Sequence, residues 1–321
     1  MLSAKDINGL YAIIPTPALP GANRLDARNT VDLDETERLV NALIRDGIDA
    51  LITLGTTGEC ATLTQEEFEA FADCVARVVN RRVPLFIGTT ALAAHTVAER
   101  LRFVQERGAD GTLLGMPMWQ PCTTPMAVQY YREVCENFPN LALMVYANAR
   151  AFRFPFPQDF WVEVKKAAPT VVAAKYSRPA GLAELVAATK GGINFVPNDM
   201  RVDKFFELSP ASTTACWATA AAMGPSPSIA MARAIRDRNA AGIKAVGADI
   251  KWANEPIKPL VENAELFASY NIQVEKIRIE AAGYCKPGPI RPPYDFIPDE
   301  YRAASVECGR RWAELCKRYA N

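Results

Sequence analysis

Residues 141–148 (LALMVYAN) and 170–177 (TVVAAKYS) are two short apolar runs, and each of them ends in polar side chains. Runs of this kind are typical of parallel β-strands that are buried on both faces. Six more lie to either side of them: YAIIP (11–15), ALITLG (50–55), VPLFIGTT (83–90), GTLLG (111–115), NFVPN (194–198) and TTACWATAA (213–221). The eight runs begin about 20–40 residues apart, which leaves room for a helix after each strand.

Helical patterns occupy the intervals between these runs. In LDETERLVNALIRDGI (33–48), apolar residues recur along one face of a helix, and Gly47 is placed to cap its C-terminus. The sequence TQEE (64–67) is a capping-box signature for the start of another helix. Eight alternations of strand and helix predict an α/β fold of the (β/α)8 type, a TIM barrel, over residues 1–225.

The strand pattern stops near residue 225, and the remaining part of the chain has helical patterns. One of them is DEYRAASVECGRRWAELCKRYAN (299–321), and the proline-rich stretch KPGPIRPPYDFIP (286–298) connects it to the helix before it. We therefore predict that residues 226–321 form a C-terminal helical extension that packs on the outside of the barrel.

The composition disfavours several classes of function. Lysine plus arginine and aspartate plus glutamate number 36 each, so no net charge attracts nucleic acid or an anionic membrane surface. No apolar run reaches the roughly 18–20 residues that a transmembrane helix requires, and the N-terminus lacks the pattern of a secretory signal. We expect a cytoplasmic protein, and we expect its eight scattered cysteines to be reduced and mostly buried.

The chain has one histidine, His95, in a segment that resembles the first turn of a helix. A zinc aldolase needs several imidazole ligands, and a Ser-His-Asp hydrolase needs a histidine in its site. We therefore expect chemistry that uses no histidine, no metal ion and no bound cofactor. A metal-dependent aldolase is a remote alternative.

Lys175 is the sharpest candidate for a catalytic residue. Active sites of such barrels lie at the C-terminal ends of the strands, and Lys175 ends the run VVAAK (171–175). Desolvation at the barrel mouth favours the neutral amine, which is the nucleophile that forms imines with ketones. The ordinary alternative is a lysine whose stem packs on the strand end while its ammonium group reaches solvent.

Two further elements stand at strand ends. Tyr146 ends the fifth run, where it can relay protons in place of a histidine or simply cap the barrel. After the second run, GTTGE (55–59) places Thr56 and Thr57 between glycines, so that backbone N–H groups and hydroxyls are offered to a carboxylate. The pentapeptide lacks the lysine of a P-loop and the spacing of a dinucleotide-binding motif.

GTTGE, Tyr146 and Lys175, in this order, resemble the N-acetylneuraminate lyase and dihydrodipicolinate synthase family of pyruvate-dependent lyases. The resemblance covers the whole chain. It implies that Lys175 forms an imine with pyruvate, that Tyr146 shuttles protons, and that Thr56 and Thr57 hold the pyruvate carboxylate. The sequence PMW (117–119) stands where the synthases carry a tyrosine pair, which argues against dihydrodipicolinate synthesis.

Longer segments resemble the hydratase-aldolases of aromatic degradation, among them GTTGECATLTQEE, LGMPMW, VYANARAFRF, CWATAA, YNIQVEK and GPIRPPY. Those enzymes hydrate an arylidene pyruvate and cleave the adduct to an aromatic aldehyde and pyruvate. The resemblance implies that Asn148 orients the added water, that Trp217 packs against the aryl ring, and that Asn271 lies near the distal end of the substrate. Trp217 in itself favours a flat apolar substrate over a sugar acid, with barrel packing as the alternative.

The ortho substituent of the aryl ring is less constrained. Arg153 and Arg178 stand shortly after the fifth and sixth runs, where they could pair with an ortho-carboxylate or be solvated loop residues. This slightly favours 2'-carboxybenzylidene pyruvate over the 2'-hydroxy compound. A pyruvate lyase acting on an aliphatic or sugar keto acid and a non-catalytic ligand-binding barrel stay open as alternatives. The expected partners are small molecules, pyruvate and an aromatic aldehyde, and the resemblance implies a homo-oligomer, with a tetramer favoured.

Overall fold

The computed structural model describes residues 1–320, and its centre is a sheet of eight parallel strands. The strands are β1 Gly9–Ile13, β2 Ala50–Thr53, β3 Leu85–Ile87, β4 Gly111–Leu114, β5 Ala142–Tyr146, β6 Val171–Lys175, β7 Asn194–Val196 and β8 Ala215–Ala218. Neighbours in the sheet follow the order β7-β6-β5-β4-β3-β2-β1-β8. Each strand overlaps one of the eight apolar runs, so this part of the prediction is confirmed.

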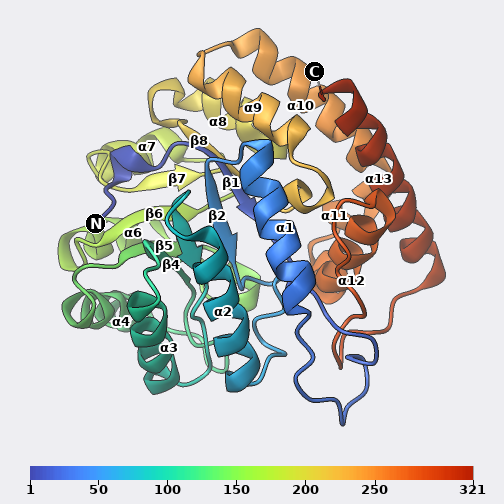
Figure 1. The fold of residues 1–321 in the computed structure, drawn as a ribbon. Helices are drawn as coiled ribbons and strands as arrows, with labels where there is room; N and C mark the ends of the chain where they lie inside the picture. Colours follow the sequence, from blue (N-terminus) through green and yellow to red (C-terminus); the bar gives the residue numbers. More distant parts are fainter. Residues whose placement is uncertain (321) are drawn as a thin grey trace.

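The sheet closes into a barrel between β7 and β8. A parallel bridge pairs Asn198 with Trp217, and the backbone N–H of Trp217 donates to the carbonyl of Pro197 at 2.9 Å. Figure 1 shows the strands in the middle of the molecule with helices around them. Because the strands are parallel, the loops that follow β2, β5, β6 and β8 meet at one mouth of the barrel.

The helices are α1 Leu33–Asp46, α2 Gln65–Val79, α3 Ala94–Glu106, α4 Thr124–Asn137, α5 Ala149–Phe152, α6 Gln158–Ala167, α7 Leu182–Ala188, α8 Val202–Leu208, α9 Ser226–Arg236, α10 Ala240–Asn254, α11 Lys258–Glu262, α12 Ala264–Ala282 and α13 Asp299–Arg318. Both predicted helix ends are confirmed. Thr64 and Glu67 form a reciprocal capping box at the start of α2, and Gly47 ends α1 with a φ of 98°. That left-handed φ is one that glycine adopts without strain.

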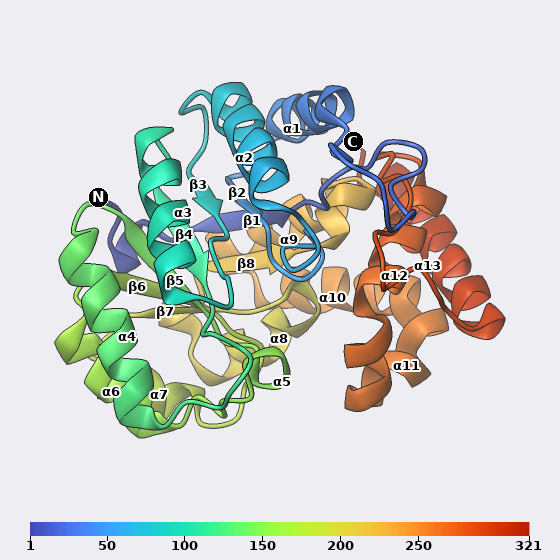
Figure 2. The same ribbon diagram turned by 90° about the horizontal axis from the view of Figure 1, so that it is seen from below.

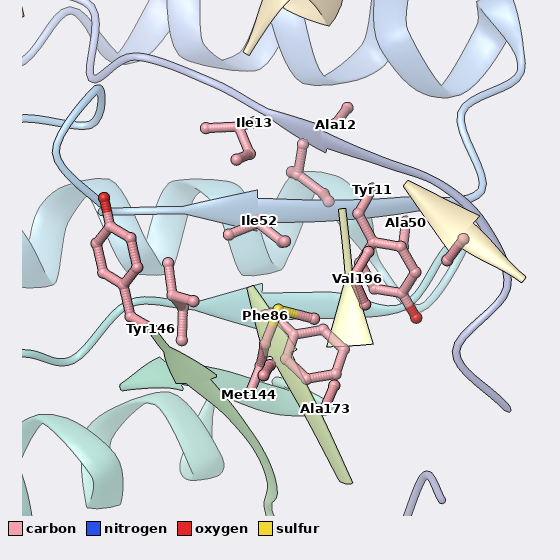
Figure 3. Close-up of a cluster of buried hydrophobic side chains, with 14 of the residues drawn as sticks. Tyr11, Ala12, Ile13, Ala50, Ile52, Phe86, Met144, Tyr146, Ala173 and Val196 are labelled. Atoms are coloured by element: carbon pink, nitrogen blue, oxygen red, sulfur yellow. The ribbon is translucent and has the colours of Figure 1, made fainter. Parts of the chain in front are cut away.

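Apolar side chains fill the barrel interior. Figure 3 shows them between Tyr11 at one end and Tyr146 at the other, with Phe86 and Ala173 among those in between. Side chains alternate between the two faces of a strand. Since Ala173 points into the barrel, Lys175 two residues later lies on the same inner face, at the mouth. The strand period thus places the amine inside the barrel.

Helices α10 to α13 lie outside the strand–helix repeat and are grouped at one side of the barrel (Figure 2). Helices α12 and α13 pack along each other, and α10 packs against α9 and α13. The barrel core continues into α13 through Trp312 and Leu315, which confirms a helical extension packed on the barrel. A small separate core joins these helices through Ile257, Leu260, Val274, Ile297 and Cys308.

The exact division of the chain at residue 225 stays an interpretation. Helix α9 follows that point, yet it packs against β1 and β8 and so takes the place of the eighth helix of the barrel. Asn321, the last residue of the predicted extension, lies outside the described residues. Among residues 1–320, no helix combines the length and the apolar composition that crossing a lipid bilayer requires.

Candidate active site

Lys175 and Tyr146 stand side by side at the mouth of the barrel. They are paired residues of the neighbouring strands β5 and β6, and each is the last residue of its strand. Lys175 Nζ lies 4.7 Å from the centroid of the Tyr146 ring and 3.5 Å from that of the Trp217 ring. The amine is therefore held between two aromatic rings that come from β5 and β8.

Burial lowers the pKa of Lys175 below its ordinary value, because a charged ammonium group loses hydration there. A protonated amine would gain a cation–π attraction from the indole, which opposes part of that effect. Lys175 forms no salt bridge within the described part of the chain. Its surroundings thus raise the fraction of neutral amine. Among residues 1–320 no carboxylate pairs with Nζ, and the more distant Glu275 opposes only part of the lowering.

The hydroxyl of Tyr146 connects the lysine to the loop after β2. It shares a hydrogen bond of 2.9 Å with Thr56 Oγ1, and the Tyr146 side chain is buried. The ring packs edge-on against Phe152 at 5.3 Å between centroids. Gly115 makes room for Phe152, since a Cβ at that position would lie 2.0 Å from the Phe152 ring. A phenol fixed in this way can pass a proton between Thr56 and a group bound at Lys175.

Residues 55–59 form a compact turn, called the GTTGE turn below, that follows β2. Gly58 is required by space, because a Cβ there would lie 2.7 Å from the backbone nitrogen of Leu54. Within residues 1–320, the N–H groups of Thr56 and Thr57 donate no hydrogen bond to the protein. Unpaired backbone donors next to a hydroxyl suit an anionic oxygen, so the turn can hold a carboxylate beside Tyr146.

The other predicted residues lie in two different environments. Asn148 caps α5 at the mouth, where its side chain accepts from the N–H of Ala151 at 3.2 Å and is partly buried. Asn271 is partly buried on α12, next to Tyr270, whose backbone departs from helical geometry. The structure thus places Asn148 directly beyond Tyr146, and it places Asn271 on the helical extension.

Arg153 and Arg178 are both exposed, and each donates to a backbone carbonyl. Arg153 Nη1 donates to Trp119 at 2.9 Å, and Arg178 Nη1 donates to Pro155 at 2.8 Å. Each guanidinium group therefore already ties one loop at the mouth to another. A bidentate pair with a substrate carboxylate would have to compete with these bonds.

His95 is exposed in the first turn of α3, as expected for a histidine outside the site.

All eight cysteines are free; five are buried and three are partly buried, which agrees with the expected reduced thiols. In the part of the chain that the structure describes, no group of three or more His, Cys, Asp or Glu side chains is arranged to hold a metal ion.

One cluster of charged residues was missed by reasoning from the sequence. Glu59, the last residue of the GTTGE turn, is fully buried and forms salt bridges with two basic side chains. Lys276 Nζ of α12 donates to Glu59 Oε2 at 2.8 Å, and Arg291 Nη1 donates to the same oxygen at 2.6 Å. The only local signal was the glutamate itself, since its partners lie more than 200 residues away.

A second buried cluster joins α12 to the residue that follows β8. Glu275 accepts from Arg278, which also donates to Thr219 Oγ1 at 3.0 Å. Nearby, Asp199 accepts from Ser228 Oγ at 2.8 Å, and burial raises the pKa of Asp199 to about 6. Helix α12 therefore contacts the chain after β2 through Lys276 and the chain after β8 through Arg278.

These features define a class of α/β-barrel enzyme in which an amine at a strand end attacks a carbonyl group. Residues 21–151 match the model of the dihydrodipicolinate synthetase family. The trans-o-hydroxybenzylidenepyruvate hydratase-aldolase of Pseudomonas putida is 40% identical over 99% of this chain and 97% of its own. The chain therefore belongs to the dihydrodipicolinate synthetase family, and it is a class I carbon–carbon lyase of the hydratase-aldolase type.

Two further similarities support this placement. The trans-2'-carboxybenzalpyruvate hydratase-aldolase of Nocardioides sp. (strain KP7) is 38% identical over 99% of this chain and 96% of its own. A solved structure of PhdJ bound to a substrate intermediate superimposes with a TM-score of 0.95 at 36% identity, and 99% of each chain is covered. The similarity thus extends over the barrel and over the helical extension.

Proposed function

We propose that this protein hydrates a benzylidene pyruvate with an ortho substituent and then cleaves the adduct to an aromatic aldehyde and pyruvate. The observation that carries the proposal is the position of Lys175 Nζ between the rings of Trp217 and Tyr146, where no carboxylate of residues 1–320 pairs with it. Such an amine is suited to form an imine with the ketone of the substrate. The full-length similarity to hydratase-aldolases supports the same reaction.

In the proposed first half-reaction, Lys175 attacks the ketone carbon and water leaves, which gives a protonated imine conjugated to the carbon–carbon double bond. The positive imine draws electrons from that double bond, so water adds to the carbon that bears the aryl ring. The carbon next to the imine then takes up a proton. Asn148 lies at the mouth just beyond Tyr146 and is the candidate for orienting this water.

In the second half-reaction, the new hydroxyl group loses its proton and the bond between the two former alkene carbons breaks. The aromatic aldehyde leaves, and the bonding electrons pass into the imine to form an enamine. Protonation of the enamine carbon and hydrolysis of the imine then release pyruvate. Tyr146 is placed to move the protons, because its hydroxyl bonds Thr56 beside the carboxylate-binding turn.

The indole ring of Trp217 has a neighbour within the protein itself. It lies against Lys175 Nζ, with 3.5 Å between the nitrogen and the ring centroid. We propose that the indole face stabilises the positive imine, and that its edge remains available to the aryl ring of the substrate. Asn271 on α12 is the candidate for contacting the distal end of that ring.

The ortho substituent of the substrate is proposed only as a chemical class. A 2'-carboxy group could pair with Arg153 or Arg178, but the guanidinium groups of both arginines already donate to backbone carbonyls. The relatives include enzymes named for the 2'-hydroxy and for the 2'-carboxy substrate. We therefore propose an oxygen-bearing ortho substituent, with the 2'-carboxy and 2'-hydroxy compounds as the two substrates to compare.

The deciding experiment follows the near-ultraviolet absorbance of the two compounds when each is mixed with purified enzyme. The conjugated chromophore is lost on hydration, so rapid loss supports the proposal and the ratio of kcat/KM values identifies the substituent. Borohydride added with pyruvate should attach reduced pyruvate to the peptide that contains Lys175. Trapping without any loss of aryl chromophore would indicate a lyase for aliphatic or sugar keto acids, and no trapping would favour a ligand-binding barrel.

Tyr146→Phe tests the proton relay separately. The substitution keeps the ring beside Lys175 and removes the hydroxyl that bonds Thr56. We expect kcat for cleavage to fall by about 10²- to 10⁴-fold. Unchanged cleavage by a folded variant would rule out this role for the phenol.

The assembly and location of the protein are proposed on the resemblance alone. We infer a homotetramer located in the cytoplasm. Light scattering of the purified protein would measure the assembly, and a monomer at micromolar concentration would contradict it.

A further inference from the structure

The GTTGE turn is attached to the C-terminal extension by a buried charge cluster. Glu59 Oε2 accepts from Lys276 at 2.8 Å and from Arg291 at 2.6 Å, and Glu59 Oε1 accepts from the backbone N–H of Arg291 at 2.9 Å. The side chains of all three residues are at most 3% exposed. Both oxygens of the carboxylate are thus fixed by residues that follow the barrel in sequence.

The two cations are themselves held by backbone carbonyls. Lys276 Nζ donates to Pro289 at 2.7 Å, and Arg291 donates to Thr16 at 3.1 Å and to Thr30 at 3.2 Å. The first of these contacts joins α12 to the proline-rich connector, and the others join the connector to the loop after β1. The cluster is therefore a rigid junction between three segments, with Glu59 at its centre.

The backbone of Glu59 shows why the anchor matters for the turn. Its φ is 54°, a left-handed conformation that is unfavourable for a residue other than glycine. In this conformation its N–H closes the turn by donating to the Thr56 carbonyl at 2.9 Å. The ion pairs of the side chain hold the residue in this state, and so they fix the direction of the N–H groups at Thr56 and Thr57.

We propose that Glu59, Lys276 and Arg291 form a positioning unit, through which the C-terminal extension sets the geometry of the carboxylate-binding turn. In this proposal none of the three touches the substrate, so they are positioning residues and not catalytic ones. The inference rests on the proposed function, because it takes Thr56 and Thr57 as the site of the pyruvate carboxylate. A displacement of about 1 Å in such a site can reduce binding or rate by up to about 10²-fold.

The test uses the full-length protein with Glu59→Gln, which preserves the size of the side chain and removes its charge. Borohydride trapping at Lys175 is measured with pyruvate, which has a carboxylate, and with acetone, which has none. We expect the half-saturating pyruvate concentration to rise about 10- to 100-fold. The rate of trapping with acetone is expected to stay within about twofold of the wild type, because the amine is untouched.

Glu35→Gln is the matched control. Glu35 is also a buried carboxylate on the barrel, and it accepts from Arg38 at 2.6 Å and from the backbone N–H of Lys286 at 2.7 Å. It therefore ties the connector to α1 without touching the GTTGE turn. We expect Glu35→Gln to leave the ratio of pyruvate to acetone trapping unchanged.

A merely structural role for the cluster predicts a different result. Glu59→Gln would then alter trapping by both ketones equally, or by neither, and either outcome overturns the proposal. If Glu59→Gln does not fold, Lys276→Arg keeps the charge and moves the donor, and it should raise the half-saturating pyruvate concentration by a smaller factor. If the wild-type protein itself shows no trapping at Lys175, the proposed function fails before any variant is compared.

Discussion

Two lysines of the molecule, the partly buried Lys175 and the fully buried Lys276, have contrasting surroundings. Lys175 stands at the end of β6 between two aromatic rings, and it has no salt bridge within the described residues. Lys276 stands on α12, where it binds Glu59 at 2.8 Å and a backbone carbonyl at 2.7 Å. Burial lowers the pKa of both side chains, but at Lys276 the adjacent carboxylate opposes the shift.

The difference separates a nucleophile from a structural cation. An amine that must attack a carbonyl has to lose its proton near neutral pH, and a neighbouring carboxylate would make that harder. An ammonium group that must fix a loop needs its charge, and the adjacent carboxylate favours the charged form. The presence or absence of one carboxylate beside a buried lysine therefore distinguishes the two roles more clearly than burial does.

The largest expected effect is on catalysis. Lys175→Ala should reduce both hydration and cleavage by on the order of 10³-fold or more, because both steps use the same imine. Stopped-flow absorbance measures hydration, and aldehyde release measures cleavage. If hydration survived in a variant that no longer cleaves, the shared imine would be wrong.

The second expected effect is on stability, and it has opposite signs at the two lysines. Lys276→Met removes one of the two cationic partners of the buried Glu59 and leaves Arg291, so we expect the free energy of unfolding to fall by about 1.5–3 kcal/mol. Lys175→Met removes an amine whose charged form is disfavoured by burial and that has no salt bridge within the described residues, so it should leave stability unchanged or increase it. Urea unfolding of both variants at pH 7 makes the comparison. Equal destabilisation by the two substitutions would contradict the distinction.

The pH dependence of trapping gives a third prediction. Because the pKa of Lys175 is lowered in the folded protein, the neutral amine is present at a lower pH than for an ordinary lysine. Below that pKa the rate of trapping by pyruvate should fall about tenfold for each unit of pH. The same shift means that the unfolded chain holds this proton more tightly, so the amine costs stability below pH 10.5 and Lys175→Met removes that cost.

The midpoint of that profile is measured from initial trapping rates in buffers of constant ionic strength. A midpoint at the value of a free lysine would contradict the argument from desolvation. The Tyr146→Phe variant is a suitable companion, since a change of midpoint there would show how far the phenol influences the amine.

The smallest expected effect concerns the aromatic ring beside the amine. Trp217→Leu keeps an apolar side chain and removes the π face that lies 3.5 Å from Lys175 Nζ. If the indole face stabilises the positive imine by about 0.5–2 kcal/mol, removing it should slow trapping by pyruvate roughly 2- to 30-fold. Pyruvate has no aryl group, so an unchanged rate would mean that Trp217 serves only the ring of the substrate.

Local patterns were enough to predict the barrel. Eight apolar runs at regular spacing reflect strands that are buried on both faces, and helix caps such as Gly47 and the Thr64–Glu67 box depend on a few adjacent residues. Lys175 and Tyr146 could be selected because the ends of parallel strands converge at one mouth. Their pairing in the structure follows from that topology.

The surroundings of these residues could not be predicted in the same way. The contact of Trp217 with the amine depends on the closure of the barrel between β7 and β8, which no local pattern specifies. The engagement of Arg153 and Arg178 with backbone carbonyls depends on the paths of two loops. A resemblance suggested roles for these residues, but it gave no distances.

The strand–helix repeat, the amine at a strand end and the family similarity could all be predicted from the sequence, because each rests on short-range periodicity or on contiguous motifs. The anchoring of Glu59 by Lys276 and Arg291 emerges only on folding, since these partners lie 217 and 232 residues after Glu59 in the chain. The physical reason is that a charge gains its function from what surrounds it after folding. A lysine has the same appearance in the sequence whether a carboxylate or an indole lies beside it in the folded protein.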